Sequence, residues 1–145
     1  MKKKVFIILS VFWICFIFFN SSLSTESSSN VSGRVVAWVQ PILNFFKIDM
    51  ETAQISHYIR KAAHVFEFFV LTLLAVPIFF DFKYKYLIVL GYGVLIASID
   101  ETIQAFRERG SSIKDVGIDT IGICLAILIC FLYEIVVIRN KKNKS

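Results

Sequence analysis

The sequence predicts an all-α fold: a membrane-embedded bundle of four transmembrane helices in one domain, residues 1–145, with an interfacial helix after the first span. Hydrophobic residues make up 57% of the chain and charged residues only 19%, whereas soluble domains average about 45–50% apolar and about 25% charged residues. The charged residues fall in blocks between long apolar runs. At 145 residues the chain has the length of a single domain.

The first span is predicted at about residues 5–20, an apolar run that follows three lysines. A cleaved signal peptide is the alternative reading of such a run. We expect the helix to be retained, because the polar residues 20–24 contain no Ala-x-Ala cleavage site. Residues 20–56 are then expected outside, as a Ser-rich loop followed by an interfacial segment. Trp38 and its apolar neighbours suit the headgroup level of the membrane.

Three further spans are predicted at about residues 58–80, 86–106 and 116–138. The short tails Lys2–Lys4 and Arg139–Lys144 are rich in lysine and arginine. Because basic residues near span ends stay on the cytoplasmic side, we expect a multi-pass protein of the cell membrane with both termini in the cytoplasm. A net charge of +5 is also typical of nucleic-acid-binding proteins. We expect no nucleic-acid partner here, because no soluble domain presents a binding groove.

Ionisable side chains recur at helical spacing within three of the predicted spans. A charged side chain at the bilayer centre costs at least about 2.5–3.5 kcal/mol on insertion scales. We therefore expect three polar helix faces to meet in one cleft near the outer ends of the helices. The faces consist of His57, Arg60, Lys61, His64 and Glu67; of Asp100, Glu101 and Gln104; and of Asp115 and Asp119.

Most of these residues are predicted to bind a ligand, namely Arg60, Lys61, His64, Glu67, Glu101, Gln104, Arg109, Asp115 and Asp119. The candidates for catalysis are His64, Glu67, Asp100 and Glu101, because carboxylates and histidine can exchange protons with a substrate. His64 beside two carboxylates could also hold a metal. We predict no metal and no cofactor, since the sequence has no Cys/His metal spacing and no Gly-rich phosphate loop.

Structural readings of the same residues stay open. His64 and Glu67 are three residues apart, so they could form a simple intrahelical pair. Glu101 and Arg109 could form a bridge that fixes the connection between the last two spans. In either case the charges would hold the bundle together without binding a ligand.

The ordered motifs Arg60–Glu67, Asp100–Gln104 and Lys114–Gly122, with an arginine-bearing loop before the last of them, resemble the VanZ-like membrane family. The resemblance covers nearly the whole chain. The family's loop usually carries a Pro/Gly-Arg turn, whereas this chain has Arg107–Gly110, and we assign the loop arginine to Arg109. The matched positions are His64, Glu67, Asp100, Glu101, Gln104, Arg109, Asp115, Asp119 and Gly122.

The family's namesake is associated with low-level teicoplanin resistance, so the resemblance implies a role in the bacterial cell envelope. The leading hypothesis is an outward polar cleft that engages a membrane lipid or another amphipathic, lipid-linked envelope molecule. A second hypothesis is a membrane hydrolase or transferase that uses Asp100 or Glu101 as base with help from His64. The third is a structural or assembly protein in which the charges join the helices.

Overall fold

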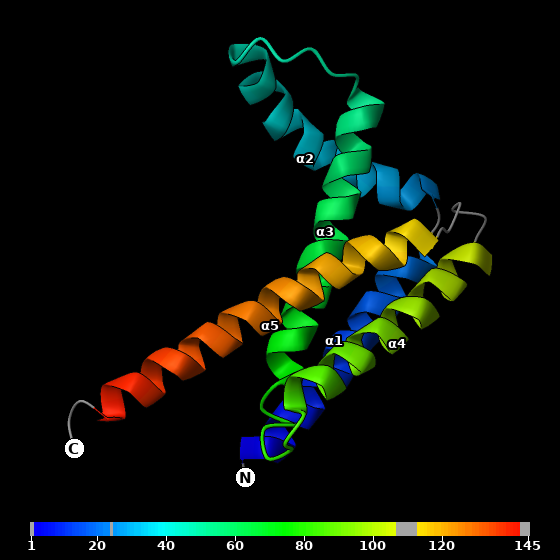
Figure 1. Ribbon diagram of the computed structural model, residues 1–145. Coiled ribbons are helices and arrows are strands. Elements are labelled where there is room, and N and C mark those ends of the chain that lie inside the picture. The colour runs from blue at the N-terminus through cyan, green and yellow to red at the C-terminus, as the bar shows by residue number, and fades with distance from the viewer. Residues whose placement is uncertain (1, 24, 107–112, 143–145) are drawn as a thin grey trace.

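The computed structural model describes residues 2–23, 25–106 and 113–142, and over these residues all regular structure is helical. Figure 1 shows a bundle of α1, α3, α4 and α5, while α2 runs beside the start of α3 and extends with it beyond the other helices. The helices are α1 (Lys2–Ser22), α2 (Thr25–Phe45), α3 (Thr52–Ala75), α4 (Lys85–Phe106) and α5 (Ile113–Lys142).

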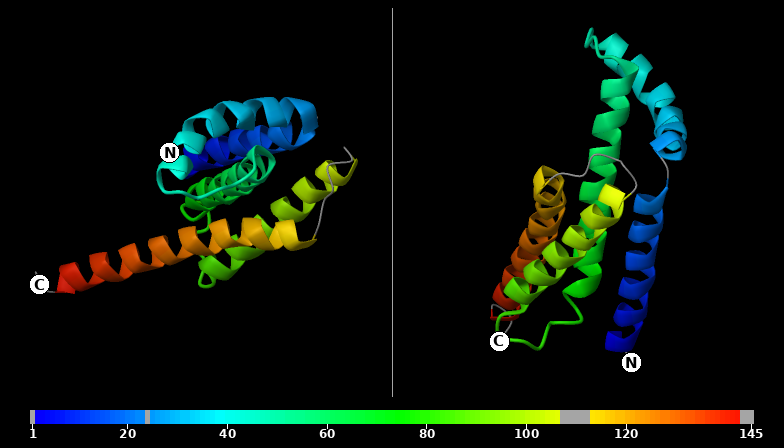
Figure 2. Two further views of the ribbon diagram at one scale, coloured as in Figure 1. Left: turned by 90° about the horizontal axis from the view of Figure 1, so that it is seen from above. Right: turned by 90° about the vertical axis from the view of Figure 1, so that its right-hand side faces the viewer.

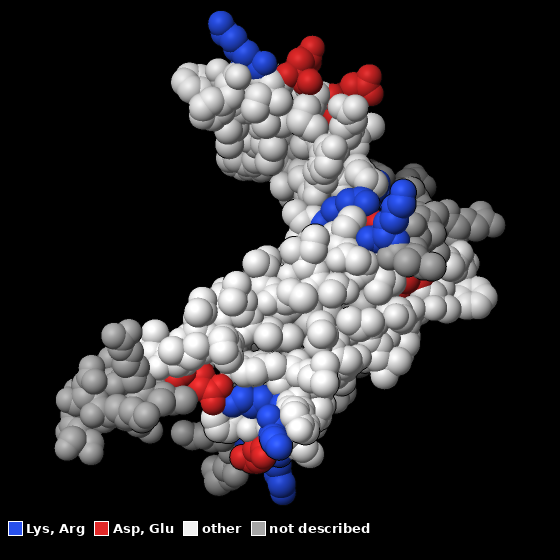
Figure 3. Space-filling view, viewed as in Figure 1, with Lys and Arg blue, Asp and Glu red and all other residues white. Residues whose placement is uncertain are grey.

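Three of the described helices, α1, α4 and α5, are long and apolar enough to cross a membrane, over Lys3–Ser22, Lys85–Phe106 and Lys114–Val137. A helix of about 20 residues spans the ~30 Å hydrocarbon core of a bilayer. The predicted spans 5–20, 86–106 and 116–138 are thus confirmed as apolar helices of membrane-crossing length. Figure 3 shows charged residues at the top, in the middle and near the bottom of the view, with a broad uncharged surface between the middle and lower groups. The chain is therefore a multi-pass membrane protein.

Helix α3 differs from the span predicted at 58–80, because it begins at Thr52 and ends at Ala75. Its last turn closes where the Val76 amide donates to the Thr72 carbonyl, 3.0 Å away. Pro77 follows, and because proline has no backbone N–H it cannot continue the helical hydrogen bonds, although Val76 before it keeps helical dihedral angles. With 24 residues, α3 is long enough to span a membrane. Its charged residues, however, make it less apolar than α1, α4 and α5, and it is not among the helices apolar enough to cross. A fourth crossing stays a prediction.

The prediction of a Ser-rich loop after the first span is wrong from Thr25 onward, because α2 begins at that residue. Serine has only a moderately unfavourable helix propensity, which tertiary packing readily overrides. The packing comes from α3: Val36 and Ile55 are both buried, and the hydroxyls of Ser32 and Ser56 lie 2.6 Å apart. Trp38 is 81% exposed, which suits the predicted interfacial position but does not establish it.

The bundle helices share one apolar core. Its buried members come from all four of them: Ile17, Phe68, Leu71, Ile96, Ala97 and Ile123. Figure 2 shows from two further sides that the start of α5 lies near the ends of α1 and α4. The polar segments of these helices are therefore gathered at one end of the bundle, and the N-terminus lies at the other.

A second polar cluster joins α4 to α5 near the N-terminal end of the bundle. Glu134 accepts hydrogen bonds from Lys85 Nζ and from the Tyr86 hydroxyl, each 2.7 Å long. The Lys85 ammonium also lies 4.1 Å from the centre of the Phe80 ring. Glu134 on α5 is thus held by two neighbouring residues of α4.

Tyr86→Phe is expected to lower the free energy of unfolding by about 1 kcal/mol, since it removes one hydrogen bond and keeps the ring. Tyr133→Phe is the matched control, because the Tyr133 side chain is largely exposed and no hydrogen bond of its hydroxyl is seen among the described residues. Unfolding by sodium dodecyl sulfate in mixed micelles would compare the two variants. Equal stability of both would show that the Glu134 cluster contributes little.

Candidate functional site

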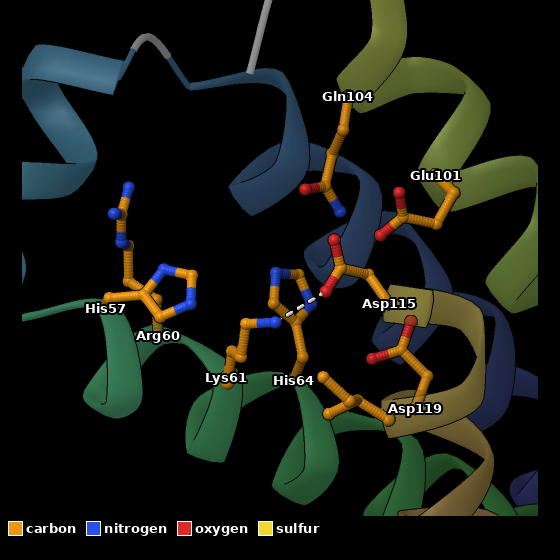
Figure 4. A pocket seen from close by; sticks show the side chains of 9 residues that line it. His57, Arg60, Lys61, His64, Glu101, Gln104, Asp115 and Asp119 are labelled. Carbon is orange, nitrogen blue, oxygen red and sulfur yellow. Dashed lines mark hydrogen bonds and ion pairs between the residues drawn. The ribbon is translucent and has the colours of Figure 1, made fainter. Parts of the chain in front are cut away.

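A polar cavity of about 110 Å³ lies between α3, α4 and α5 at the end of the bundle away from the N-terminus. Figure 4 shows its side chains from α3 on one side and those from α4 and α5 on the other. The residues that line it are His57, Arg60, Lys61, His64, Glu101, Gln104, Asp115, Ile118 and Asp119. The predicted meeting of three polar helix faces is thus present in the structure.

Helical spacing explains why these residues share a cavity. On α3 the cavity-lining positions are His57, the adjacent pair Arg60 and Lys61, and His64; each member of the pair is three or four residues from either histidine, which places all four on one face of the helix. The same spacing relates Glu101 to Gln104 on α4, and Asp115 to Asp119 on α5. Glu101 is 8% exposed and Asp119 is 2% exposed, so both carboxylates lie below the surface.

An ion pair between described residues crosses the cavity. Lys61 Nζ on α3 donates to Asp115 Oδ1 on α5 at 2.8 Å, and about a third of each side chain is exposed. Exposed pairs of this kind contribute at most about 1 kcal/mol to stability. The Lys61–Asp115 pair therefore joins the two walls of the cavity but adds little to the stability of the bundle.

A second layer of polar residues lies beside the cavity and includes two predicted catalytic candidates that do not line it. Asp100 is fully buried, and its Oδ2 accepts hydrogen bonds from Ser21 and Gln104, both at 2.8 Å. Glu67 accepts a 2.7 Å hydrogen bond from Asn20. Both carboxylates are held by donors that orient them.

His64 connects this layer to the cavity. Its Nδ1 lies 3.5 Å from Glu67 Oε2 and 3.9 Å from Asp100 Oδ2. The intrahelical pairing of His64 with Glu67 is therefore confirmed as a contact, and Asp100 from α4 extends it to a second helix. Because His64 also lines the cavity, a group that can gain or lose a proton faces the space where a ligand would lie.

Residues of α1 in this layer were missed by the sequence reasoning. Asn20 and Ser21 were assigned to the outer loop, yet α1 continues to Ser22 and directs both side chains at carboxylates. Trp13 adds a 2.9 Å hydrogen bond from its Nε1 to the main-chain oxygen of Glu67. A usable signal was available: two small polar residues directly follow a long apolar run, where they can reach the polar end of a neighbouring helix.

Asp119 Oδ2 on α5 and Arg60 Nε on α3 are buried polar atoms at the cavity that have no hydrogen-bond partner among the described residues. Buried polar groups in proteins are nearly always hydrogen-bonded, so such atoms point to a missing water or ligand. This is the clearest indication that the cavity is built to hold something.

The loop arginines Arg107 and Arg109 lie outside the described residues, and so does the predicted bridge from Arg109 to Glu101. Over the part of the chain that the structure describes, no group of three His, Cys, Asp or Glu side chains is arranged to hold a metal ion. The assignment of the remaining residues to ligand binding or catalysis stays a prediction.

Comparison with known proteins supports the family resemblance of the sequence. The family model described as VanZ/LLP1 matches residues 6–135, which include α3, α4, most of α1 and α5, and the residues that line the cavity. No curated protein and no solved structure matches the chain significantly. The chain belongs to the VanZ/LLP1 family.

Proposed function

We propose that the protein acts in the cell envelope by holding the head group of an amphipathic or lipid-linked molecule in the cavity between α3, α4 and α5. By engaging that molecule it lowers the susceptibility of the cell to lipoglycopeptide antibiotics such as teicoplanin. The observation that carries the proposal is a small cavity with buried charges at one end of membrane helices that are otherwise apolar.

The surroundings of the cavity suit a molecule with an apolar tail. Ile121, Leu125 and Leu128 are about half exposed and continue along α5 away from the cavity end. A tail could lie against these side chains in the lipid while its polar head enters the cavity. If the N-terminus is cytoplasmic, as the basic tails predict, the cavity opens toward the outer leaflet.

The test is expression in a susceptible bacterial host. Wild-type protein is expected to reduce susceptibility to teicoplanin, and Glu101→Gln and Asp119→Asn are expected to return it to that of cells with empty vector. Asp81→Asn is the matched control, because the Asp81 side chain is 80% exposed at the far end of the bundle. If both cavity variants protect as well as wild type at equal membrane abundance, the proposal fails.

The contacts of His64 favour one second candidate, a hydrolase or transferase that acts on an envelope lipid. A histidine that faces a cavity and lies beside two carboxylates is a common arrangement for proton transfer. Turnover of labelled envelope lipids by the purified protein, lost in His64→Gln, would favour this reading over binding alone. A purely structural role would instead make protection follow protein abundance in every variant.

A further inference from the structure

The cavity is electrically polarised, because its two walls carry opposite charge. Among the described residues, the basic and imidazole side chains that line the cavity come from α3, namely His57, Arg60, Lys61 and His64. The carboxylates of the described lining residues come from α4 and α5, namely Glu101, Asp115 and Asp119. Figure 4 shows Arg60 and His57 on one side, Glu101 and Asp119 on the other, and the Lys61–Asp115 pair between them.

Each wall also contributes a buried polar atom that has no hydrogen-bond partner among the described residues. Arg60 Nε can only donate a hydrogen bond, and Asp119 Oδ2, when the carboxyl group is ionised, can only accept one. Asp119 is 2% exposed, so bulk water does not compensate it. A ligand that satisfies both atoms must offer an acceptor to the α3 wall and a donor to the α5 wall.

The volume and the charge balance restrict the ligand further. A cavity of about 110 Å³ is several times larger than the ~10–15 Å³ that one water needs by the same kind of measure. A lone cation would face Arg60 and Lys61, and a lone anion would face the carboxylates. Because burying an unpaired charge is costly, a ligand that carries both signs fits the cavity best.

We propose that the cavity takes a zwitterionic phosphate–ammonium group of the phosphoethanolamine class, with the phosphate at Arg60 and Lys61 and the ammonium at Asp119 and Asp115. The proposal rests on the proposed function and names the head group that the site accepts. The Lys61–Asp115 ion pair can separate without leaving either charge unpaired, since the ligand offers each partner a group of the opposite sign. The source can be a membrane lipid or a soluble molecule.

The first experiment measures binding to the purified full-length protein in detergent, with phosphoethanolamine, ethanolamine and inorganic phosphate as probes. Phosphoethanolamine is expected to bind at least about tenfold more tightly than either half of it, because only the zwitterion satisfies both walls. Asp119→Asn should remove the gain from the ammonium, and Arg60→Gln the gain from the phosphate. Asp81→Asn, at the far end of the bundle, should leave all three affinities unchanged.

The second experiment identifies the source. The protein is placed in nanodiscs of phosphatidylethanolamine or of phosphatidylglycerol, and its melting temperature is measured. A higher melting temperature in phosphatidylethanolamine that Asp119→Asn removes would identify a lipid head group. No difference between the lipids, together with tight binding of free phosphoethanolamine, would identify a soluble ligand.

The proposal is overturned if phosphoethanolamine binds no better than phosphate alone, or if Asp119→Asn, folded and equally abundant, binds it as wild type does. Either result would mean that the cavity holds only water or a different ligand. The susceptibility assay separates this failure from that of the proposed function. If the zwitterion does not bind but protection from teicoplanin still depends on Asp119, the proposed function stands and the zwitterion is rejected. If the zwitterion binds but the protein gives no protection, the head group is identified and the proposed function is rejected.

Discussion

Gly122→Ala is expected to destabilise the bundle by about 3 kcal/mol or more, the upper end of the cost of overpacking a core. A Cβ atom at this position of α5 would overlap the main-chain carbonyl oxygen of Val65 on α3. It would also lie 3.0 Å from the carbonyl carbon of Val65 and 3.1 Å from the amide nitrogen of Phe69. Because these are main-chain atoms, they cannot move aside without shifting α3.

Two other glycines provide matched controls. A Cβ at Gly117, on the same helix, meets no atom within 4 Å, so Gly117→Ala should be neutral or slightly stabilising. At Gly93 the nearest atom is the end of the Ile123 side chain, 2.7 Å away, and that side chain can change rotamer. Its alanine variant should be intermediate in unfolding by sodium dodecyl sulfate and in membrane abundance. Equal stability of the Gly122 and Gly117 variants would contradict the close approach of α3 and α5.

The close approach at Gly122 also bears on the site. Gly122 lies one helical turn from Asp119, and Val65 follows His64 directly in the chain. Separating α3 from α5 at this point would widen the cavity that both helices line. We therefore expect Gly122→Ala to lose antibiotic protection together with stability, whereas Asp119→Asn should lose protection alone.

Much of the fold and the pairing of the polar faces could be predicted because each depends on local spacing. A run of about 20 apolar residues is sufficient to predict a membrane-length helix, and α1, α4 and α5 follow it closely. Residues three or four apart share a helix face in any helix, which is why Lys61, His64 and Asp119 were expected in one cleft. These predictions needed no knowledge of how the helices cross.

What could not be predicted depends on contacts between distant segments. The Ser-rich start of α2 looks like a loop until packing on α3 is known, since its own sequence favours a helix only weakly. Asn20 and Ser21 became part of the polar layer only because α1 lies against α3 and α4. The sequence also placed Asp100 and Glu101 together, whereas Asp100 is turned away from the cavity that Glu101 lines.

Asp100→Leu is expected to cost about 3 kcal/mol, the upper end of the penalty for leaving a buried hydrogen-bonding group without its partner. The substitution removes the acceptor of two 2.8 Å hydrogen bonds, from the Ser21 hydroxyl and the Gln104 amide. Asp100→Asn should cost less, since an amide oxygen can still accept from one of these donors. Asp81→Leu makes the same change at an exposed site and should be nearly neutral.

A double variant shows whether the cost of Asp100→Leu comes from donors left without an acceptor or from the loss of the charge itself. If the cost of Asp100→Leu arises at Ser21, then Ser21→Ala should cost less in the leucine background than in wild type, which gives a measurable coupling energy between α1 and α4. Replacing buried polar groups together with apolar ones is often well tolerated, so the pair should recover part of the lost stability. Purely additive effects in unfolding by sodium dodecyl sulfate would mean that this hydrogen bond does not join the two helices. A coupling near the full cost of Asp100→Leu would instead make α1 an integral part of the site, because the donors that hold Asp100 also set its distance from His64.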